Sequence, residues 1–242
     1  MKPFLYAVAE TFYKKYGPEV SKIAFVFPNR RSGVFFQKYL ATVAGHPLFS
    51  PPVLTVSELM AEMTGLIQAD RISMLFILYK HFKRLSQSEE SFDNFLFWGE
   101  MLLNDFDDAD KYLVDVRQLF TNVRELKEID ESFNYLSEEQ VEAIRCFWSH
   151  FIPAQESAKK RQFVAVWEIL YSLYCSLRED LGSKGLGYEG MIFRTAAERT
   201  RNREPVHLPY KKVVFIGLNA LNKAEEMVLK QLKTVEIGRA HV

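Results

Sequence analysis

A hundred consecutive residues, 53–152, contain no proline and only two glycines, Gly65 and Gly99. Because these two residue types interrupt helices, the stretch indicates a mainly helical segment. Asp70 is placed to cap a helix that runs to about residue 85. Its expected apolar face is Ile72, Leu75, Phe76, Tyr79 and Phe82. A capping box at 137–140, a helix at 141–151 and a long apolar stripe from 163 to 181, closed by Gly182, extend the helical prediction to about residue 200.

The two ends of the chain have a different pattern. Short continuous apolar runs bounded by turn residues are typical of strands buried on both faces of a parallel sheet. Three such runs occur, at Ile23–Phe27, Val53–Val56 and Val213–Ile216. Helices are expected after them at 32–44 and 222–233, and Thr55 with Glu58 forms a second capping box before another helix. The predicted fold class is therefore α/β with dominant helix, its parallel sheet interrupted by a large all-helical insertion.

This pattern divides the chain into four parts. Residues 1–65 and 206–235 form the two pieces of the α/β domain, and residues 66–205 form the helical insertion. The last residues, 236–242, look like the translation of a sequencing-adapter oligonucleotide and are left out of the fold prediction. Two or three strands make a small sheet, so we expect the chain to be a truncated piece of a larger protein.

The charge distribution and the composition restrict the classes of protein to which the chain can belong. The chain has 31 basic and 31 acidic side chains, but they are segregated. Residues 1–85 carry 11 basic against 5 acidic groups, residues 86–140 carry 4 against 15, and residues 141–242 carry 16 against 11. The net charge of zero is therefore the sum of oppositely charged segments, and it does not exclude a nucleic-acid partner. Two cysteines and the lack of a long apolar run predict a cytoplasmic protein that does not enter a membrane.

No catalytic or metal motif stands out. The chain lacks the Gly-x4-Gly-Lys-Ser/Thr string that wraps nucleotide phosphates, and its glycine cluster at 182–187 is best read as a helix stop and turn. Histidines and cysteines lack zinc spacing. An acidic cluster is expected at a helix-to-helix junction, where its later members favour the start of the next helix; it contains Asp105, Asp107, Asp108 and Asp110.

The candidate ligand site is the turn after the first strand, Pro28-Asn29-Arg30-Arg31-Ser32. It lies at the carboxyl edge of the predicted sheet, where open α/β sheets place ligands. Two arginines, an Asn and backbone amides at a helix start suit phosphate oxygens. Helix-start capping with solvated arginines is the structural alternative. A second basic stretch is equally compatible with a solvated linker or a phosphate-contacting arm; it contains Arg194, Arg199, Arg201, Arg203, Lys211 and Lys212.

Residues 25–36, which include this turn, resemble the N-terminal signature of bacterial AddB/RexB-type proteins, a PD-(D/E)XK nuclease family whose helicase-like subunits act in double-strand-break repair. Three further stretches, 104–110, 140–151 and 214–225, are similar to the same family. The resemblance implies a RecA-like domain interrupted by a helical subdomain, with the turn at 28–31 touching single-stranded DNA. It also implies that residues 216–225 occupy the Walker B region.

Within that region the chain departs from active relatives. Ile216 stands before Gly217 where related members have an Asp, and Glu225 lies downstream. Without that Asp and without a Walker A loop, the module is expected to be an inactivated pseudo-helicase. The family's nuclease domain, which implies Mg²⁺, would lie beyond this fragment, so no cofactor is expected in the fragment itself. The resemblance further implies an AddA-type helicase subunit as partner.

The leading expectation is therefore a non-catalytic, helicase-like module that binds DNA and docks a partner during DNA end processing and recombinational repair. The candidate DNA contacts are Asn29, Arg30, Arg31 and Ser32. One rival is a helical protein-interaction scaffold with no nucleic-acid role. Another is an α/β enzyme that acts on a phosphorylated small molecule at the same turn.

Overall fold

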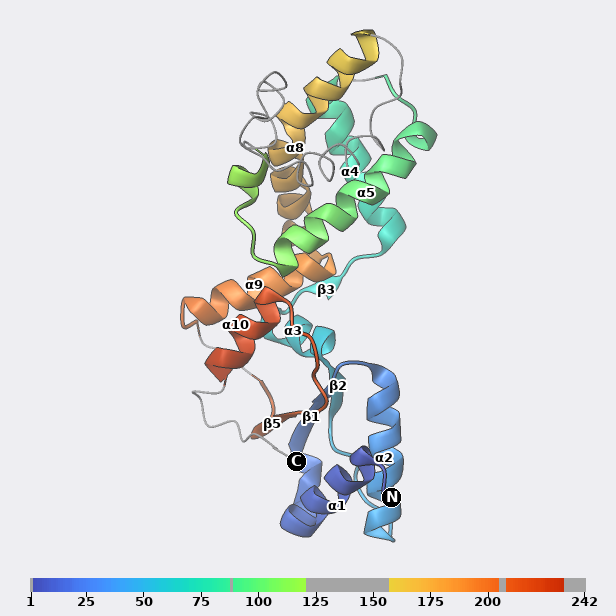
Figure 1. Ribbon diagram of the computed structural model, residues 1–242, viewed down its shortest axis with the longest axis vertical. Helices are drawn as coiled ribbons and strands as arrows, with labels where there is room; N and C mark the ends of the chain where they lie inside the picture. The colour runs from blue at the N-terminus through green and yellow to red at the C-terminus, as the bar shows by residue number, and fades with distance from the viewer. Residues whose placement is uncertain (1, 88, 121–156, 205–207, 233–242) are drawn as a thin grey trace, which may run out of the picture. The chain divides into compact units, whose positions relative to one another are not determined.

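The computed structural model describes residues 2–87, 89–120, 157–204 and 208–232 (Figure 1). The expected capping box at 137–140, the helix at 141–151 and the C-terminal tail lie outside these ranges. Contacts divide the chain into two compact units. The first comprises residues 1–69, 110–113 and 185–242, and the second comprises 70–109 and 114–184.

The first unit is built on a three-stranded parallel sheet. The strands are β1 (Ile23–Phe27), β2 (Val53–Thr55) and β5 (Lys212–Phe215), in the order β2-β1-β5. Phe25 is in register with Val53 on one side and with Val214 on the other. Every residue of β1 is buried, as a central strand with two covered faces requires. The prediction of a small parallel sheet within a mainly helical α/β chain is therefore confirmed.

Helices cover both faces of this sheet (Figure 1). Phe25 and Phe27 pack with Val214 against α1 (Phe4–Tyr16) and α2 (Arg30–Ala44), and a short 3-10 turn, η1 (Gly17–Lys22), joins α1 to β1. On the opposite face the smaller side chains of Ala24 and Val26 pack against α3 (Val56–Thr64), α9 (Glu189–Arg201) and α10 (Lys223–Leu232). The unit is thus a layered α/β/α arrangement, and alternation along β1 assigns its side chains to the two cores.

Gly33 sets how closely α2 approaches the sheet. A Cβ atom built on Gly33 would lie 2.4 Å from Cγ1 of Val53 on β2. Real Cβ atoms do not tolerate such a distance, so a larger residue would fit there only if the Val53 side chain, the helix or the strand shifted. The glycine that follows the Asn29–Ser32 turn therefore has a packing role.

The boundaries of the first unit differ from the sequence prediction. We expected residues up to 205 to belong to the helical insertion, but α9 packs against α3 and α10. The glycine cluster is only partly a turn: Gly185 has a φ of +68°, whereas Leu186–Gly187 forms β4, which pairs in parallel with β3 (Ile67–Gln68). These two-residue strands have too little periodic pattern to be recognised in a sequence.

The second unit is helical. Its described helices are α4 (Arg71–Ser86), α5 (Phe92–Lys111), which ends in the first unit, and α8 (Ser157–Ser183), which runs one residue beyond the predicted stop at Gly182. Asp70 caps α4 as predicted, accepting a hydrogen bond from the Ser73 amide. The predicted apolar face of α4 is partly wrong. Ile72 and Phe76 are exposed, and the buried face is Met74, Leu75, Leu78 and Phe82.

The acidic cluster does not form the predicted junction. Asp105, Asp107, Asp108 and Asp110 all lie within the last turns of α5. Carboxylates near a helix C-terminus are unfavourable for the helix dipole, but Asp110 is completely buried and hydrogen-bonded (see below). The actual junction follows at 112–115, where Asp115 accepts a hydrogen bond from the Gln118 amide. The buried contacts of Asp110 therefore outweigh the unfavourable position of carboxylates at the end of α5.

Candidate functional site at the carboxyl edge of the sheet

The turn between β1 and α2 is closed by its own side chains. Asn29 has an extended backbone, with φ −154° and ψ 158°, and is the N-cap of α2. Its Oδ1 atom accepts hydrogen bonds from the Ser32 amide at 2.9 Å and from the Ser32 hydroxyl at 3.1 Å. Asn29 and Ser32 therefore use their polar groups to start the helix, as the structural alternative predicted.

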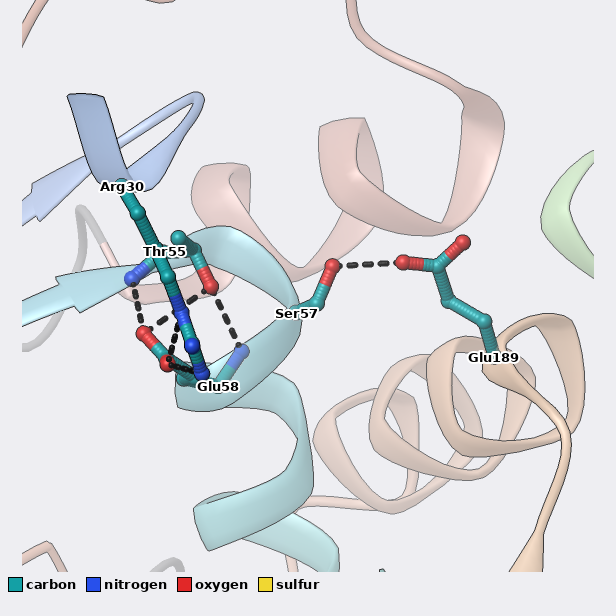
Figure 2. Close-up of polar contacts among 5 residues, drawn as sticks. All are labelled: Arg30, Thr55, Ser57, Glu58 and Glu189. Atoms are coloured by element: carbon teal, nitrogen blue, oxygen red, sulfur yellow. Dashed lines mark hydrogen bonds and ion pairs between the residues drawn. The ribbon is translucent and has the colours of Figure 1, made fainter. Parts of the chain in front are cut away.

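Arg30 is held by a carboxylate of the next helix. Its Nε and Nη2 atoms donate to one oxygen of Glu58 at 3.1 and 2.7 Å (Figure 2). The guanidinium side chain is nevertheless 84% exposed, so this ion pair is a surface contact of modest strength. A phosphate that binds Arg30 would have to compete with Glu58.

Glu58 also completes the predicted capping box of α3. Its second oxygen accepts a hydrogen bond from the Thr55 amide at 2.7 Å, and the Thr55 hydroxyl accepts one from the Glu58 amide at 3.2 Å (Figure 2). Partial burial favours the neutral acid. The hydrogen bonds from the Thr55 amide and from Arg30 outweigh this effect and hold the pKa of Glu58 below its usual value.

Arg31 is the remaining cation of the turn. Its side chain is exposed at the first turn of α2, and within the described part of the chain no acidic group pairs with it. Of the four residues expected to contact DNA, two cap a helix and one is paired with Glu58. Only Arg31 presents an uncompensated charge.

The Walker B-like segment places its residues in separate roles. Ile216 is 4% exposed and extends the β1–β5 ladder, because its amide donates to the Val26 carbonyl at 2.9 Å. Gly217 then turns the chain with a φ of +70°. Glu225 forms a capping box with Asn222 at the start of α10, in which each backbone amide donates to the other residue's side chain at 2.9 Å.

A polar contact between distant segments was not predicted from the sequence. Glu189, the first residue of α9, accepts hydrogen bonds from the Ser57 hydroxyl at 2.6 Å (Figure 2) and from Lys111 at 2.5 Å. Burial opposes ionisation of Glu189, but the bonds from Lys111 and Ser57 prevail and lower its pKa. Burial, together with the charge of Glu189, raises the pKa of Glu225. Nothing local marks this group, since its members are far apart in sequence.

A second contact of this kind centres on Asp110, which is completely buried. The Arg194 guanidinium donates to Asp110 at 2.6 Å, and the Tyr188 hydroxyl donates to the other carboxylate oxygen at 2.6 Å. Arg199 in turn donates to the backbone carbonyls of Met63 and Thr64. Two arginines of the second basic stretch therefore hold the fold together, and the phosphate-arm interpretation does not apply to them.

Carboxylates thus occupy the helix starts at this edge. An exposed helix N-terminus attracts anions through its unpaired amides and its dipole. Here Glu58, Glu189 and Glu225 lie in the first turns of α3, α9 and α10. Because these anions belong to the chain itself, a bound phosphate would meet negative charge at three helix starts. Among the described residues of the β1–α2 turn, the cation without an acidic partner is Arg31.

The described ranges contain neither a metal-binding cluster nor a membrane-spanning helix. No group of three or more His, Cys, Asp or Glu side chains is arranged to hold a metal ion there. Among the same residues, no helix has both the length and the apolar character that crossing a membrane requires. Comparison with protein-family models and with curated proteins gave no match for this chain.

Proposed function

We propose that this chain is a non-catalytic DNA-binding and partner-docking module, an inactivated RecA-like domain of an AddB-type nuclease subunit that acts in double-strand-break repair. One observation supports it above others: the carboxylates of Glu58, Glu189 and Glu225 occupy the starts of α3, α9 and α10 at the edge where open α/β sheets place ligands. Because these carboxylates would repel the phosphates of a nucleotide bound at the helix starts, this edge is better suited to contact a DNA phosphate backbone through the exposed Arg31.

The proposed mode of binding is electrostatic. Arg31 would contact a phosphate directly, and Arg30 would exchange Glu58 for a second phosphate. Exchange of an exposed ion pair for a phosphate contact costs little, because the pair itself contributes about 0–1 kcal/mol. Backbone contacts of this type hold DNA without reading its sequence.

Salt-dependent DNA binding tests the proposal. We expect Arg31→Gln to weaken binding of a labelled single-stranded oligonucleotide and to reduce the slope of log K against log[salt] by about 0.7, the value for one lost phosphate contact. Lys38→Gln removes one exposed positive charge from the same helix and is the matched control. Equal affinity and equal salt slope for the Arg31 variant and the control would refute DNA binding at this turn.

The exposed apolar side chains of the second unit favour a protein-interaction function as the alternative. Ile72 and Phe76 on α4 are 62% and 53% exposed, and Phe97 on α5 is 73% exposed. Exposed aromatic residues are enriched where proteins dock. If the chain binds no nucleic acid at low salt but its Phe97→Ser variant loses association with a helicase subunit, the scaffold function replaces the proposed one.

A further inference from the structure

Four lysines gather at the opposite, amino edge of the sheet. We call Lys15, Lys22, Lys211 and Lys212 the lysine patch. Ile23 is in register with Lys212 in the parallel β1–β5 pair, so Lys22 and Lys211 precede neighbouring strands side by side. Strands in a sheet are about 4.8 Å apart, which brings these two backbones close together.

Tyr16 at the end of α1 joins the remaining two lysines. The Lys212 ammonium lies 5.1 Å from the centre of the Tyr16 ring and 3.4 Å from its hydroxyl. The Lys15 ammonium lies 5.4 Å from the same ring. Lys212, through its hydrogen bond to the hydroxyl, lowers the pKa of Tyr16, as expected where positive charge is concentrated.

The patch is only partly neutralised. Glu19 pairs with Lys22 at 2.5 Å. Over the described part of the chain, no carboxylate pairs with Lys15, Lys211 or Lys212. Four lysines against one glutamate leave a formal charge of +3 on a small surface. Like charges on neighbouring strands repel, so the sheet would be more stable with other residues there.

The chemistry of the patch favours one class of partner. Its cations are all lysines, whose compact ammonium groups bind phosphates as point charges without a fixed geometry. A membrane-bound surface also needs apolar side chains that insert between lipids. None of the described large apolar residues with high exposure belongs to η1, to β5 or to the last turn of α1.

We propose that the lysine patch is a second nucleic-acid surface, which binds the phosphate backbone of single-stranded DNA. It does not depend on the Arg31 turn, since the two surfaces lie at opposite ends of the same strands. Two or three phosphates contacted here would place a strand along the amino edge, and sequence would not be read.

The test uses the full chain and a labelled oligothymidine of about 25 nucleotides, titrated between about 50 and 200 mM salt. The Lys211→Gln/Lys212→Gln variant is compared with Lys38→Gln/Lys80→Gln, which removes two exposed lysines from α2 and α4. We expect only the former to weaken binding strongly and to reduce the salt slope by about 1.4, for two lost contacts. Equal affinities and slopes for the two variants would overturn the proposal.

Two further arms separate this site from the alternatives. Lys15→Gln/Lys211→Gln leaves the Lys212–Tyr16 contact intact and should give the same loss of binding, with a thermal midpoint no lower than that of the parent chain. Polyglutamate and anionic lipid vesicles are then tested as competitors against unlabelled DNA. If polyglutamate competes as well as DNA does, the patch binds an acidic protein instead; if the vesicles do, it binds a membrane. If the lysine variants lose binding and Arg31→Gln does not, the lysine patch is a DNA-binding surface and the proposed DNA contact at the Arg31 turn is refuted. If only Arg31→Gln loses binding, the turn binds DNA and the lysine patch does not.

Discussion

The buried ion pair of Asp110 and Arg194 gives the sharpest prediction for stability. Asp110 is fully buried and the Arg194 side chain is only 13% exposed. Asp110→Asn removes the buried negative charge at 2.6 Å from the Arg194 guanidinium and leaves the more exposed Glu198 carboxylate at 3.8 Å. Breaking a buried pair on one side costs about 3–5 kcal/mol, a large part of the 5–15 kcal/mol that stabilises a typical domain.

Urea unfolding followed by circular dichroism measures this cost. With an m value of about 2 kcal/mol/M, the midpoint should fall by roughly 2 M. The double variant Asp110→Asn/Arg194→Met removes both charges and keeps a long apolar side chain, so it should regain most of the loss. A loss under about 1 kcal/mol for Asp110→Asn, or a double variant that loses as much as the two single variants together, would refute the reasoning.

Two other predictions concern packing and acid stability. Gly33→Ala should destabilise the first unit by about 1–3 kcal/mol because the new methyl group meets Val53. In thermal unfolding, the double variant Gly33→Ala/Val53→Ala should lose less stability than the sum of the losses of the two single variants. The pKa of Glu189 is lowered in the folded chain, so its contribution is present above the unfolded value of about 4.3 and is lost as the pH falls through the folded value. Stability measured between about pH 6 and 3 should therefore decline less in Glu189→Gln than in the parent, and parallel declines would contradict this origin.

The sequence predicted those parts of the fold that are encoded locally. β1, β2 and β5 were recognisable because strands of a parallel sheet that is covered on both faces are continuous apolar runs ended by turn residues. The caps at Asp70 and at Thr55 with Glu58 were recognisable because a cap and its partner are three residues apart.

What could not be predicted depends on distant partners. The four aspartates of α5 looked like a junction because carboxylates favour the start of a following helix, and the contacts of Asp110 with the distant Arg194 and Tyr188 explain why α5 continues through it. The role of Arg30 changed for the same reason, since its partner Glu58 is 28 positions away. At the candidate site, the sequence predicted that a turn lies between β1 and α2, but it could not show which cation of that turn is paired.

The central position of β1 has a consequence for synthesis. Its neighbour β5 lies roughly 190 residues further along the chain. At about 5–20 residues per second, a ribosome needs roughly 10–40 seconds to supply that strand. Throughout this interval one hydrogen-bonding edge of an apolar strand has no partner, a state that invites pairing with other nascent chains. We therefore expect that the yield of native protein in cells depends more on chaperone capacity and translation rate than its final stability would suggest.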